Sequence, residues 1–395
     1  MRSRNTLYFD HQATTPVHPE VVERMAPFAS VRFGNPHSSD HVFGWNSARA
    51  VETAAERVGQ LIGADSDEII FTSGATESNN LALLGLGRRS IGGKRRRILV
   101  SAIEHKCVLA ACRALHDHYG FKIETIPVDR QGFIELAELE AALGDDVLAV
   151  SVILVNNEIG TIQRIEEISE LARKCGAIVH SDAAQAPIAM QLGTLAEHAD
   201  MLSLSAHKMY GPKGIGVTYV ARELQNQIEP LIYGGGQQQG LRSGTLPVPL
   251  CVGMGAAADL FLRQDIQDKR ARLIRRRDAF VDGLKCLAFP ISVNGAEGYA
   301  RHPGNANIGF HGYSAHDILG ALQPSLAAST GSACTTGIPE PSHVLRAIGL
   351  GVDDAESSIR FSLGFDTSDD DVTEAIGLVE SALNRLAEAD LPRTA

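Results

Sequence analysis

Between residues 68 and 220, short runs rich in β-branched residues alternate with longer stretches that show helical periodicity. The expected strands are residues 68–72, 97–101, 122–126, 148–155, 178–181, 201–205 and 216–220. The run at 148–155, LAVSVILV, is almost entirely apolar, which is typical of a central parallel strand covered by helices on both faces. The alternation predicts an α/β fold in which helices pack on a mostly parallel sheet.

The pattern changes after residue 220. A stretch rich in glycine and glutamine at 234–240 is followed by a helical region at about 249–287. Strand-like segments follow at 307–310, 327–329 and 359–362, and an amphipathic helix is expected near 369–389. These segments predict a second, smaller α+β unit.

Charge and cysteine usage exclude several classes of protein. With 36 Lys and Arg against 47 Asp and Glu, the net charge of −11 argues against binding to nucleic acid or to an acidic membrane. The 6 cysteines are scattered, so neither a disulfide framework nor a metal site is expected. We expect a cytoplasmic protein, because the N-terminus does not resemble a signal peptide and no apolar run approaches the ~20 residues of a membrane span.

Two residues at expected strand ends suggest cofactor chemistry. Lys208 follows the apolar run 201–204, and Asp182 follows the run 178–181, with Gln185 three residues later. Open α/β sheets bind ligands at the carboxyl ends of their strands, where a lysine with a lowered pKa can form a Schiff base. An acid there can pair with a pyridinium nitrogen. The alternatives are a surface lysine, Lys213 in its place, and a helix N-cap for Asp182.

The segment FTSGATE at 71–77 passes from an expected strand through small residues into a helix. Amides and hydroxyls at a helix N-terminus can bind a phosphate group. The segment matches neither a Walker A loop nor G-x-G-x-x-G. The alternative is an ordinary capping box that uses Ser73 or Thr76.

Two further residues are candidates for proton and sulfur chemistry. His105 opens a helix beyond the strand 97–101, where it could stack on a cofactor ring and pass protons, or simply cap the helix. Cys334 lies among small, turn-forming residues at 327–341, which predicts an exposed, mobile loop suited to a reactive thiolate, or else a cysteine of no consequence. The other five cysteines lie in helical or strand-like patterns, where a cysteine is usually an apolar filler.

Arg360 lies within an apolar expected strand, in SIRFS at 358–362. A buried arginine needs an anionic partner. The partner is either a substrate carboxylate or the acid of a structural salt bridge.

Taken together, these segments resemble the cysteine desulfurases of pyridoxal-phosphate fold type I, in the class V aminotransferase group, and specifically the NifS/IscS-like branch with a long active-site loop. The resemblance spans nearly the whole chain. It rests on ATTP at 13–16, FGNP at 33–36, TSGATES at 72–78, EH at 104–105, VNNEIG at 155–160, Asp182, Gln185, HK at 207–208, RSGT at 242–245, GSAC at 331–334 and SIRFS at 358–362.

The resemblance implies a large domain at 16–258 with a mostly parallel, mixed seven-stranded sheet. It implies a small domain formed by residues 1–15 and 259–395, which contains the loop at about 327–341. A homodimer is also implied, because Thr245 would reach the phosphate group of the partner subunit.

The resemblance also implies residue roles. Lys208 would hold pyridoxal phosphate and then act as the base at the α-carbon of L-cysteine, and Cys334 would take the sulfur as a persulfide and release alanine. The remaining roles are Asp182 at the pyridine nitrogen, Gln185 at the ring hydroxyl, His105 on the ring, Ala75, Thr76, Ser205 and His207 at the phosphate, and Asn157 and Arg360 at the substrate carboxylate.

The sequence departs from the family pattern without losing a reacting group. Gln238 and Gln239 stand where relatives commonly have Glu and often Arg, and Ser181 stands where Val is frequent. The chain stops at Ala395, without the tail that iron-sulfur enzymes of this family use for scaffold docking, so the usual scaffold partner is in doubt.

Three alternatives stay open within the fold: a selenocysteine lyase, an aminotransferase and a kynureninase-like hydrolase. A non-catalytic sulfur-relay protein is the alternative from another class. The sulfur acceptor is an iron-sulfur cluster scaffold, a thiolation relay, or a DNA- or cofactor-modifying system.

Overall fold

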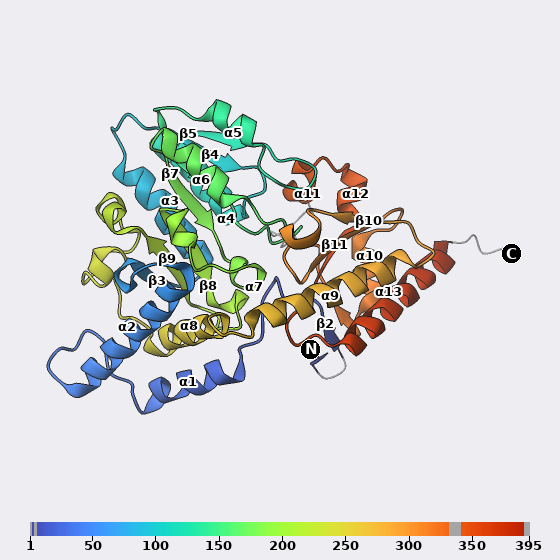
Figure 1. The fold of residues 1–395 in the computed structure, drawn as a ribbon, viewed down its shortest axis with the longest axis horizontal. Coiled ribbons are helices and arrows are strands. Elements are labelled where there is room, and N and C mark those ends of the chain that lie inside the picture. The colour runs from blue at the N-terminus through green and yellow to red at the C-terminus, as the bar shows by residue number, and fades with distance from the viewer. Residues whose placement is uncertain (1, 4–5, 332–340, 391–395) are drawn as a thin grey trace.

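The computed structural model describes residues 2–3, 6–331 and 341–390 of the 395-residue chain, and its largest element is a seven-stranded sheet (Figure 1). The strand order is β3-β9-β8-β7-β6-β4-β5. In chain order the strands are β3 (Ile69–Thr72), β4 (Arg97–Ser101), β5 (Lys122–Ile126), β6 (Val147–Ser151), β7 (Ile178–Asp182), β8 (Met201–Ser205) and β9 (Gly216–Val220).

The sheet is mostly parallel. Only β9 runs antiparallel, to both of its neighbours β3 and β8, while the five strands from β8 to β5 pair in parallel. Every residue of β6, β8 and β9 is buried, because helices cover both faces (Figure 1). The predicted α/β fold with a mostly parallel, mixed seven-stranded sheet is therefore confirmed.

The helices around this sheet include a layer formed by three of them. In this layer, α8 packs along both α1 and α2. Separately, α3 crosses β7, β8 and β9 and packs on α4. The helices are α1 (Pro19–Ser30), α2 (Val42–Ile62), α3 (Ala75–Arg89), α4 (Lys106–Tyr119), α5 (Leu136–Ala142), α6 (Ile165–Lys174), α7 (Ala186–Ala189) and α8 (Val248–Phe261).

A smaller unit follows α8. Its antiparallel sheet has the order β10-β11-β13, and a second small sheet, β1-β2-β12, unites the N-terminus with the C-terminal half. These strands are β1 (Arg2–Ser3), β2 (Thr6–Tyr8), β10 (Ile291–Asn294), β11 (Asn305–Phe310), β12 (Leu326–Ala327) and β13 (Ser358–Ser362). The helices are α9 (Ile266–Lys285), α10 (Ala315–Leu322), α11 (His343–Ala347), α12 (Val352–Glu356) and α13 (Asp369–Asp390).

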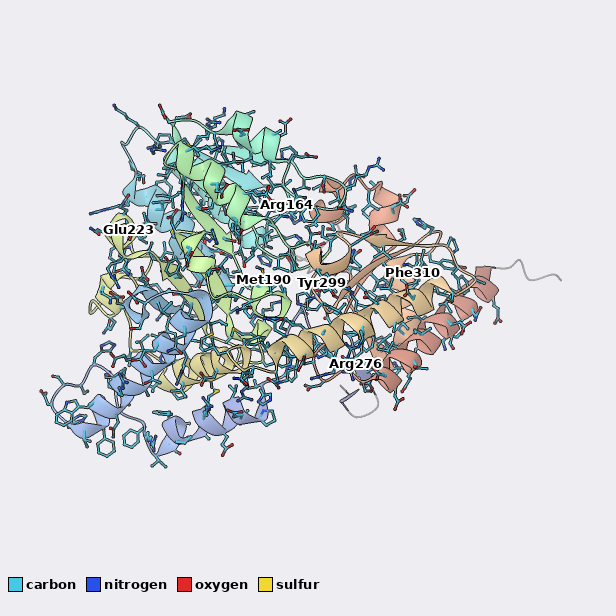
Figure 2. The ribbon with its side chains drawn as sticks, viewed as in Figure 1. Arg164, Met190, Glu223, Arg276, Tyr299 and Phe310 are labelled. Carbon is cyan, nitrogen blue, oxygen red and sulfur yellow. The ribbon has the colours of Figure 1, made fainter. Side chains whose placement is uncertain are left out.

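Four phenylalanine rings form the core of this smaller unit. Phe9 follows β2 and lies 5.4 Å from Phe280 on α9, which lies 5.1 Å from Phe361 on β13. Phe361 in turn lies 6.4 Å from Phe310, which Figure 2 labels at the end of β11. These contacts, and the pairing of β2 with β12, support the assignment of residues 1–15 to the small domain, which stays a prediction together with its boundaries at 16 and 258.

Several expected elements have other bounds in the structure. The strand expected at 148–155 ends at Ser151, because the Ile153 amide donates to a carboxylate oxygen of Glu104 and is lost to sheet pairing on that side. The helical region at 249–287 is two helices, α8 and α9, interrupted where Arg263 turns away to pair with Glu20. The strand expected at 327–329 is β12, at Leu326–Ala327.

The second of these helices, α9, connects the two units. Its buried Arg270 donates hydrogen bonds to the carbonyls of Ile188 and Pro187, at 3.0 and 2.7 Å, and to that of Met190 at 2.5 Å. Burial lowers the pKa of Arg270 to about 10. The charge of this side chain is therefore used to fix α9 against the end of α7.

No helix in the described part of the chain is long and apolar enough to cross a membrane. Within the same residues, no group of three or more His, Cys, Asp or Glu side chains is arranged to hold a metal ion.

Candidate active site

A cavity of about 550 Å³ opens where β7 and β8 end and α3 begins. This is the edge at which open α/β sheets bind ligands. A larger cavity of about 670 Å³ lies between α1, α2 and α8, and no predicted site residue lines it. The smaller cavity is lined by nine of them: Ala75, Thr76, His105, Asn157, Asp182, Gln185, Ser205, His207 and Lys208.

Lys208 stands in a short 3₁₀ turn, Ala206–Lys208, directly after β8. Its Nζ donates to the backbone oxygens of Gln12 and Ala13, the latter at 2.9 Å. Burial lowers the pKa of Lys208 to about 8, and the nearby Arg360 adds to the effect, against the opposing charges of Asp10 and Asp182. An amine with this pKa is partly unprotonated at neutral pH, as a Schiff-base lysine must be. Lys213, the competing candidate, is exposed, although it lines the same cavity.

Asp182 is the last residue of β7 and is buried. Its carboxylate accepts hydrogen bonds from Asn79 Nδ2 at 2.7 Å and from the Ala184 amide at 3.0 Å. It does not cap α7, whose N-cap position is occupied by Gln185. Asp182 is therefore a buried acid held at the cavity wall, where it can pair with a cationic ring nitrogen.

Gln185 is held in place by the N-terminal segment of the chain. Its Nε2 donates to the backbone oxygen of Gln12 at 2.9 Å, which is the oxygen that also accepts from Lys208. Because an amide nitrogen has two hydrogens, Gln185 keeps one donor for a ligand oxygen. One backbone carbonyl thus orients both side chains.

The N-terminus of α3 has no side-chain cap. Its N-cap is Gly74, with φ of 150° and ψ of 177°, a conformation that glycine adopts readily. The predicted alternative of a capping box at Ser73 or Thr76 is therefore wrong. Nearby, His207 Nδ1 contacts Thr14 Oγ1 at 3.2 Å, and burial, reinforced by Lys208 and Lys213, lowers the pKa of His207 to about 4. The uncapped amides make this end of the cavity a site for an anion.

Glu77, on the first turn of α3, joins this turn to a distant loop. Its carboxylate accepts from the Ser73 amide at 2.7 Å and from Arg242 Nε at 2.8 Å. Burial alone would raise the pKa of Glu77, but the hydrogen bonds from Arg242 and Ser73 outweigh it and lower the pKa. The loop that contains the RSGT motif is therefore fixed to the helix terminus.

Gln238 fixes the same loop to the sheet. Its side-chain amide accepts from the backbone nitrogen of Phe71 at 2.7 Å and donates to the backbone oxygen of Phe71 at 2.9 Å. Phe71 belongs to β3, at the edge of the sheet. Gln238 thus pairs with β3 as a strand backbone would, which a glutamate could not do because it has no N–H to donate.

His105 occupies the N-cap position of α4, so the predicted capping role is correct, and it lines the cavity as well. Its Nδ1 accepts from the Cys107 amide at 3.2 Å and lies 3.0 Å from Cys107 Sγ. Cys107 packs against the hydrophobic core, as expected of an apolar filler, but it also lines the cavity, which was not expected. The signal that could have revealed it is its spacing of two residues from His105.

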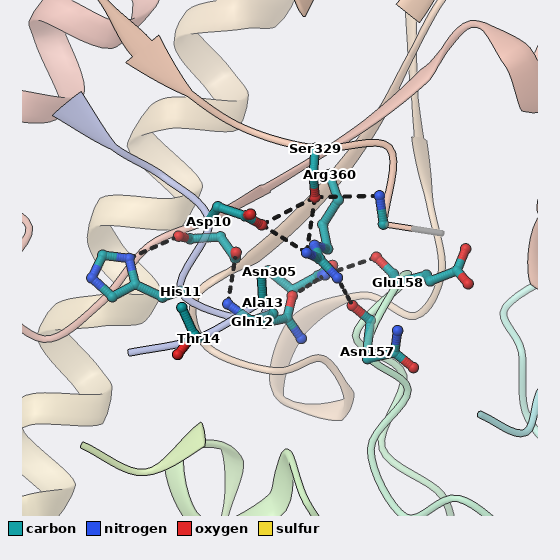
Figure 3. Close-up of polar contacts among 12 residues, drawn as sticks. Asp10, His11, Gln12, Ala13, Thr14, Asn157, Glu158, Asn305, Ser329 and Arg360 are labelled. Atoms are coloured by element: carbon teal, nitrogen blue, oxygen red, sulfur yellow. Dashed lines mark hydrogen bonds and ion pairs between the residues drawn. The ribbon is translucent and has the colours of Figure 1, made fainter. Parts of the chain in front are cut away.

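Arg360 does not line the cavity, and Figure 3 shows it among Asp10, Ser329 and Asn157. Nη1 donates to the Asn157 backbone oxygen at 2.8 Å, and Nη2 contacts Asp10 Oδ1 at 2.7 Å and Ser329 Oγ at 2.9 Å. The ion pair with Asp10 shows that the salt-bridge alternative is present. Nε is buried and has no partner among the described residues, so the guanidinium keeps a donor for a carboxylate.

Besides Arg360, two predicted residues are not among the described residues that line this cavity. Thr245 is exposed and does not line it. Cys334 lies outside the described residues. The chain on either side is anchored near Arg360: the Gly331 amide donates to Ser329 Oγ at 3.3 Å, and Ser342 donates to Glu158.

The chemistry of these groups fits pyridoxal phosphate. The cavity combines an amine with a lowered pKa, a buried carboxylate and an uncapped helix N-terminus. These are the partners required by the aldehyde, the ring nitrogen and the phosphate of that cofactor. Lys208, Asp182 and the first turn of α3 would hold those three parts.

Comparisons with known proteins agree with this arrangement. Residues 7–374 match the family model for aminotransferase class-V. The chain is 44% identical over 383 residues to the cysteine desulfurase IscS of Rickettsia felis, covering 97% of this chain and 92% of that protein. A solved NifS-like protein superposes with a TM-score of 0.88 at 32% identity, covering 96% of this chain and 100% of the other. SspA in complex with cysteine superposes with a TM-score of 0.78 at 36% identity, covering 91% and 99%.

Proposed function

The chain belongs to the class-V aminotransferase family and within it to the cysteine desulfurases, and from this premise we propose how its residues perform the reaction. It is a pyridoxal-phosphate enzyme that converts L-cysteine into L-alanine and removes the sulfur. The observation that supports this most directly is the convergence of Lys208, with its lowered pKa, and the buried Asp182 on one cavity.

Bound pyridoxal phosphate supplies a ring that accepts electrons from the α-carbon of the substrate. Lys208 would hold the cofactor covalently, and its Nζ would act as the base that takes the proton from the α-carbon of the substrate. The backbone oxygens of Gln12 and Ala13 keep that Nζ in place. Asp182 keeps the ring nitrogen protonated, and Gln185 donates to the ring hydroxyl.

The remaining cavity residues hold the two charged ends of the bound molecules. Ala75, Thr76, Ser205 and His207 bind the phosphate, with the open amides of α3 directed at its negative charge. Asn157 and Arg360 bind the substrate carboxylate. His105 would stack on the cofactor ring and relay protons there.

Cys334 takes the sulfur. Its thiolate attacks the substrate sulfur, an S–S bond forms, and the bond between that sulfur and the substrate β-carbon breaks. The electron pair of the broken bond stays with carbon, which takes up a proton to become the methyl group of alanine. Cys334 is left as a persulfide, which a reductant or an acceptor thiol can discharge.

The test measures sulfide and alanine from purified protein with L-cysteine, pyridoxal phosphate and dithiothreitol. Cys334→Ser should abolish sulfide release and keep the cofactor absorbance, while Lys208→Ala should lose both. Cys286→Ser, at an exposed cysteine on the surface, is the control and should match the wild type. Unchanged sulfide release by Cys334→Ser would refute the role of Cys334, and a protein that never binds the cofactor would favour the non-catalytic relay.

Substrate choice within the family is tested on the same protein. Alanine formation from cysteine and from selenocysteine is compared, because a selenocysteine lyase would use the second far better. Amino-group transfer to a keto acid is the reaction expected of an aminotransferase.

We propose that the enzyme is a homodimer in which Thr245 of each subunit reaches the phosphate of the other. Exposed aromatic side chains support such an interface: Phe33 is 69% exposed, Trp45 56% and Tyr233 67%. Mixing inactive Lys208→Ala with impaired Thr245→Ala should restore one intact site in each mixed dimer. No recovery, or a monomer in sedimentation, would contradict this arrangement.

The persulfide is delivered to an acceptor protein, either an iron-sulfur cluster scaffold or a thiolation factor. We place this transfer in the cytoplasm, because Cys334 must return to a free thiol after each transfer and thiols are kept reduced there. Capture of partners by the persulfide form, with Cys334→Ser as the control, tests the acceptor. Fractionation of cells tests the location.

A further inference from the structure

Asp182 and His105 are connected through two side chains that the reaction does not otherwise use. Asn79, on α3, donates from Nδ2 to Asp182 Oδ2 at 2.7 Å and to Cys107 Sγ at 3.3 Å. Cys107 Sγ then lies 3.0 Å from His105 Nδ1. The amide of Asn79 must present nitrogen to the Asp182 carboxylate, so its orientation is fixed and the sulfur of Cys107 accepts from it.

The direction of the last contact follows from the backbone. The Cys107 amide donates to His105 Nδ1 at 3.2 Å, which requires a lone pair on that nitrogen. The thiol, 3.0 Å away, can then donate to the same nitrogen. Burial, followed by the charge of Asp182, raises the pKa of Cys107 to about 11, so the sulfur keeps its proton at neutral pH.

We propose that Cys107 is a positioning residue whose S–H, together with its backbone N–H, donates to Nδ1 of His105 and keeps the proton of the neutral ring on Nε2. This inference rests on the proposed function, which gives His105 its task. The ring then enters the reaction as a hydrogen-bond donor at Nε2 and not as a base at that atom. If Nδ1 carried the proton, its N–H would point at two other donors, the S–H and the backbone N–H of Cys107.

The surroundings of His105 agree with a neutral ring. Loss of hydration lowers its pKa, although the ring is open to the cavity. Asp182 on β7 opposes this shift, whereas Lys208 after β8, His343 on α11 and Lys106 on α4 reinforce it. The net direction is downward, so the ring is mostly uncharged at neutral pH.

The test follows His105 itself and does not require turnover. Full-length protein labelled with ¹⁵N-histidine, with and without cofactor, is titrated by nuclear magnetic resonance, and His105→Gln identifies the signal. The wild type should show the Nε2–H form. Cys107→Ala should raise the pKa of His105 by about half a unit to one unit, because one donor to Nδ1 is lost.

Two further variants separate donation from packing. Cys107→Ser keeps a donor and should fall between the wild type and Cys107→Ala. Cys112→Ala removes a buried thiol from the same helix without touching His105 and should leave the titration unchanged. In active protein, the acid limb of the kcat/KM profile should move with the His105 pKa.

An unchanged His105 titration in Cys107→Ala would overturn the inference, whatever its activity. So would an equal shift in Cys112→Ala, or a larger shift in Cys107→Ser than in Cys107→Ala. If the wild type showed no desulfurase activity, only the proposed function would be refuted. The inference about Cys107 would still be testable, because the tautomer is measured without turnover.

Discussion

The lysine that the reaction needs is expected to destabilise the cofactor-free protein. Its pKa falls from 10.5 in the unfolded chain to about 8 in the folded one, mainly through burial. At 1.36 kcal/mol per unit, this shift corresponds to about 3 kcal/mol at neutral pH. That figure is an upper value, because the side chain of Lys208 is partly open to the cavity. Lys208→Met removes the buried charge and should stabilise the protein.

The two lost hydrogen bonds, to Gln12 and Ala13, offset part of this gain at about 1 kcal/mol each. We therefore expect a net stabilisation of about 1 kcal/mol below pH 8. Between pH 8 and 10.5 the unfolded lysine holds a proton that the folded one has lost, so the stability of the wild type rises with pH. The advantage of Lys208→Met should shrink across that interval and become a disadvantage at its upper end, where only the two lost hydrogen bonds remain.

Urea unfolding of cofactor-free protein, followed by circular dichroism at several pH values from 6 to 10, measures the difference. Lys213→Met is the matched control, because Lys213 is exposed in the same segment and its loss should change stability by less than about 0.5 kcal/mol. A variant less stable than the wild type at pH 7, or a difference that does not change with pH, would refute the reasoning. With cofactor bound, the order should reverse, because only Lys208 anchors it covalently.

Three more predictions concern contacts around the cavity. Arg242→Met should destabilise the protein by about 1–3 kcal/mol at neutral pH. This loss of stability should disappear as acid protonates Glu77, because the lowered pKa of Glu77 contributes stability only while its carboxylate is ionised. Urea unfolding midpoints measured against pH test this. Gln238→Glu should cost about 1–3 kcal/mol because a backbone oxygen loses its donor, whereas Gln239→Glu, at an exposed position, should be neutral in the same assay. Arg360→Lys should lower kcat/KM for cysteine at least about tenfold, since a lysine cannot hold three separate acceptors and a carboxylate; an unchanged value would remove Arg360 from the substrate site.

The sheet was predictable because burial on both faces leaves a simple mark in the sequence. The apolar run at 148–151 belongs to the interior strand β6, and all seven expected strands of the large sheet exist. Its end at Ser151 was not predictable, because Glu104, which takes the Ile153 amide, is 49 residues away in the chain. Pattern reasoning describes neighbours along the chain and cannot see such a competitor.

The site was predictable where strand ends alone bring residues together. Asp182 ends β7, and Lys208 follows the neighbouring parallel strand β8. The topology of the sheet therefore already implies that both residues lie at the same edge of the sheet. The backbone oxygens of Gln12 and Ala13, which hold Nζ, could not be found in this way, because every residue has such an oxygen.

Polar side chains near the cavity were missed for a different reason. Asn79 lies on the helix face that meets Asp182, four residues after Ala75, and that spacing was the available signal. The ion pair of Arg360 with Asp10 crosses 350 residues, so only the folded chain reveals which of the two predicted partners is present.

The pairing of Gln238 with Phe71 also bears on solubility. β3 ends the large sheet, and an edge strand with unsatisfied backbone groups can recruit a strand from another molecule and start aggregation. Gln238 hydrogen bonds to both the N–H and the C=O of Phe71. Another strand therefore cannot pair with β3 at this residue. The same residue that fixes a loop near the cofactor site therefore also protects the protein against self-association through its sheet edge.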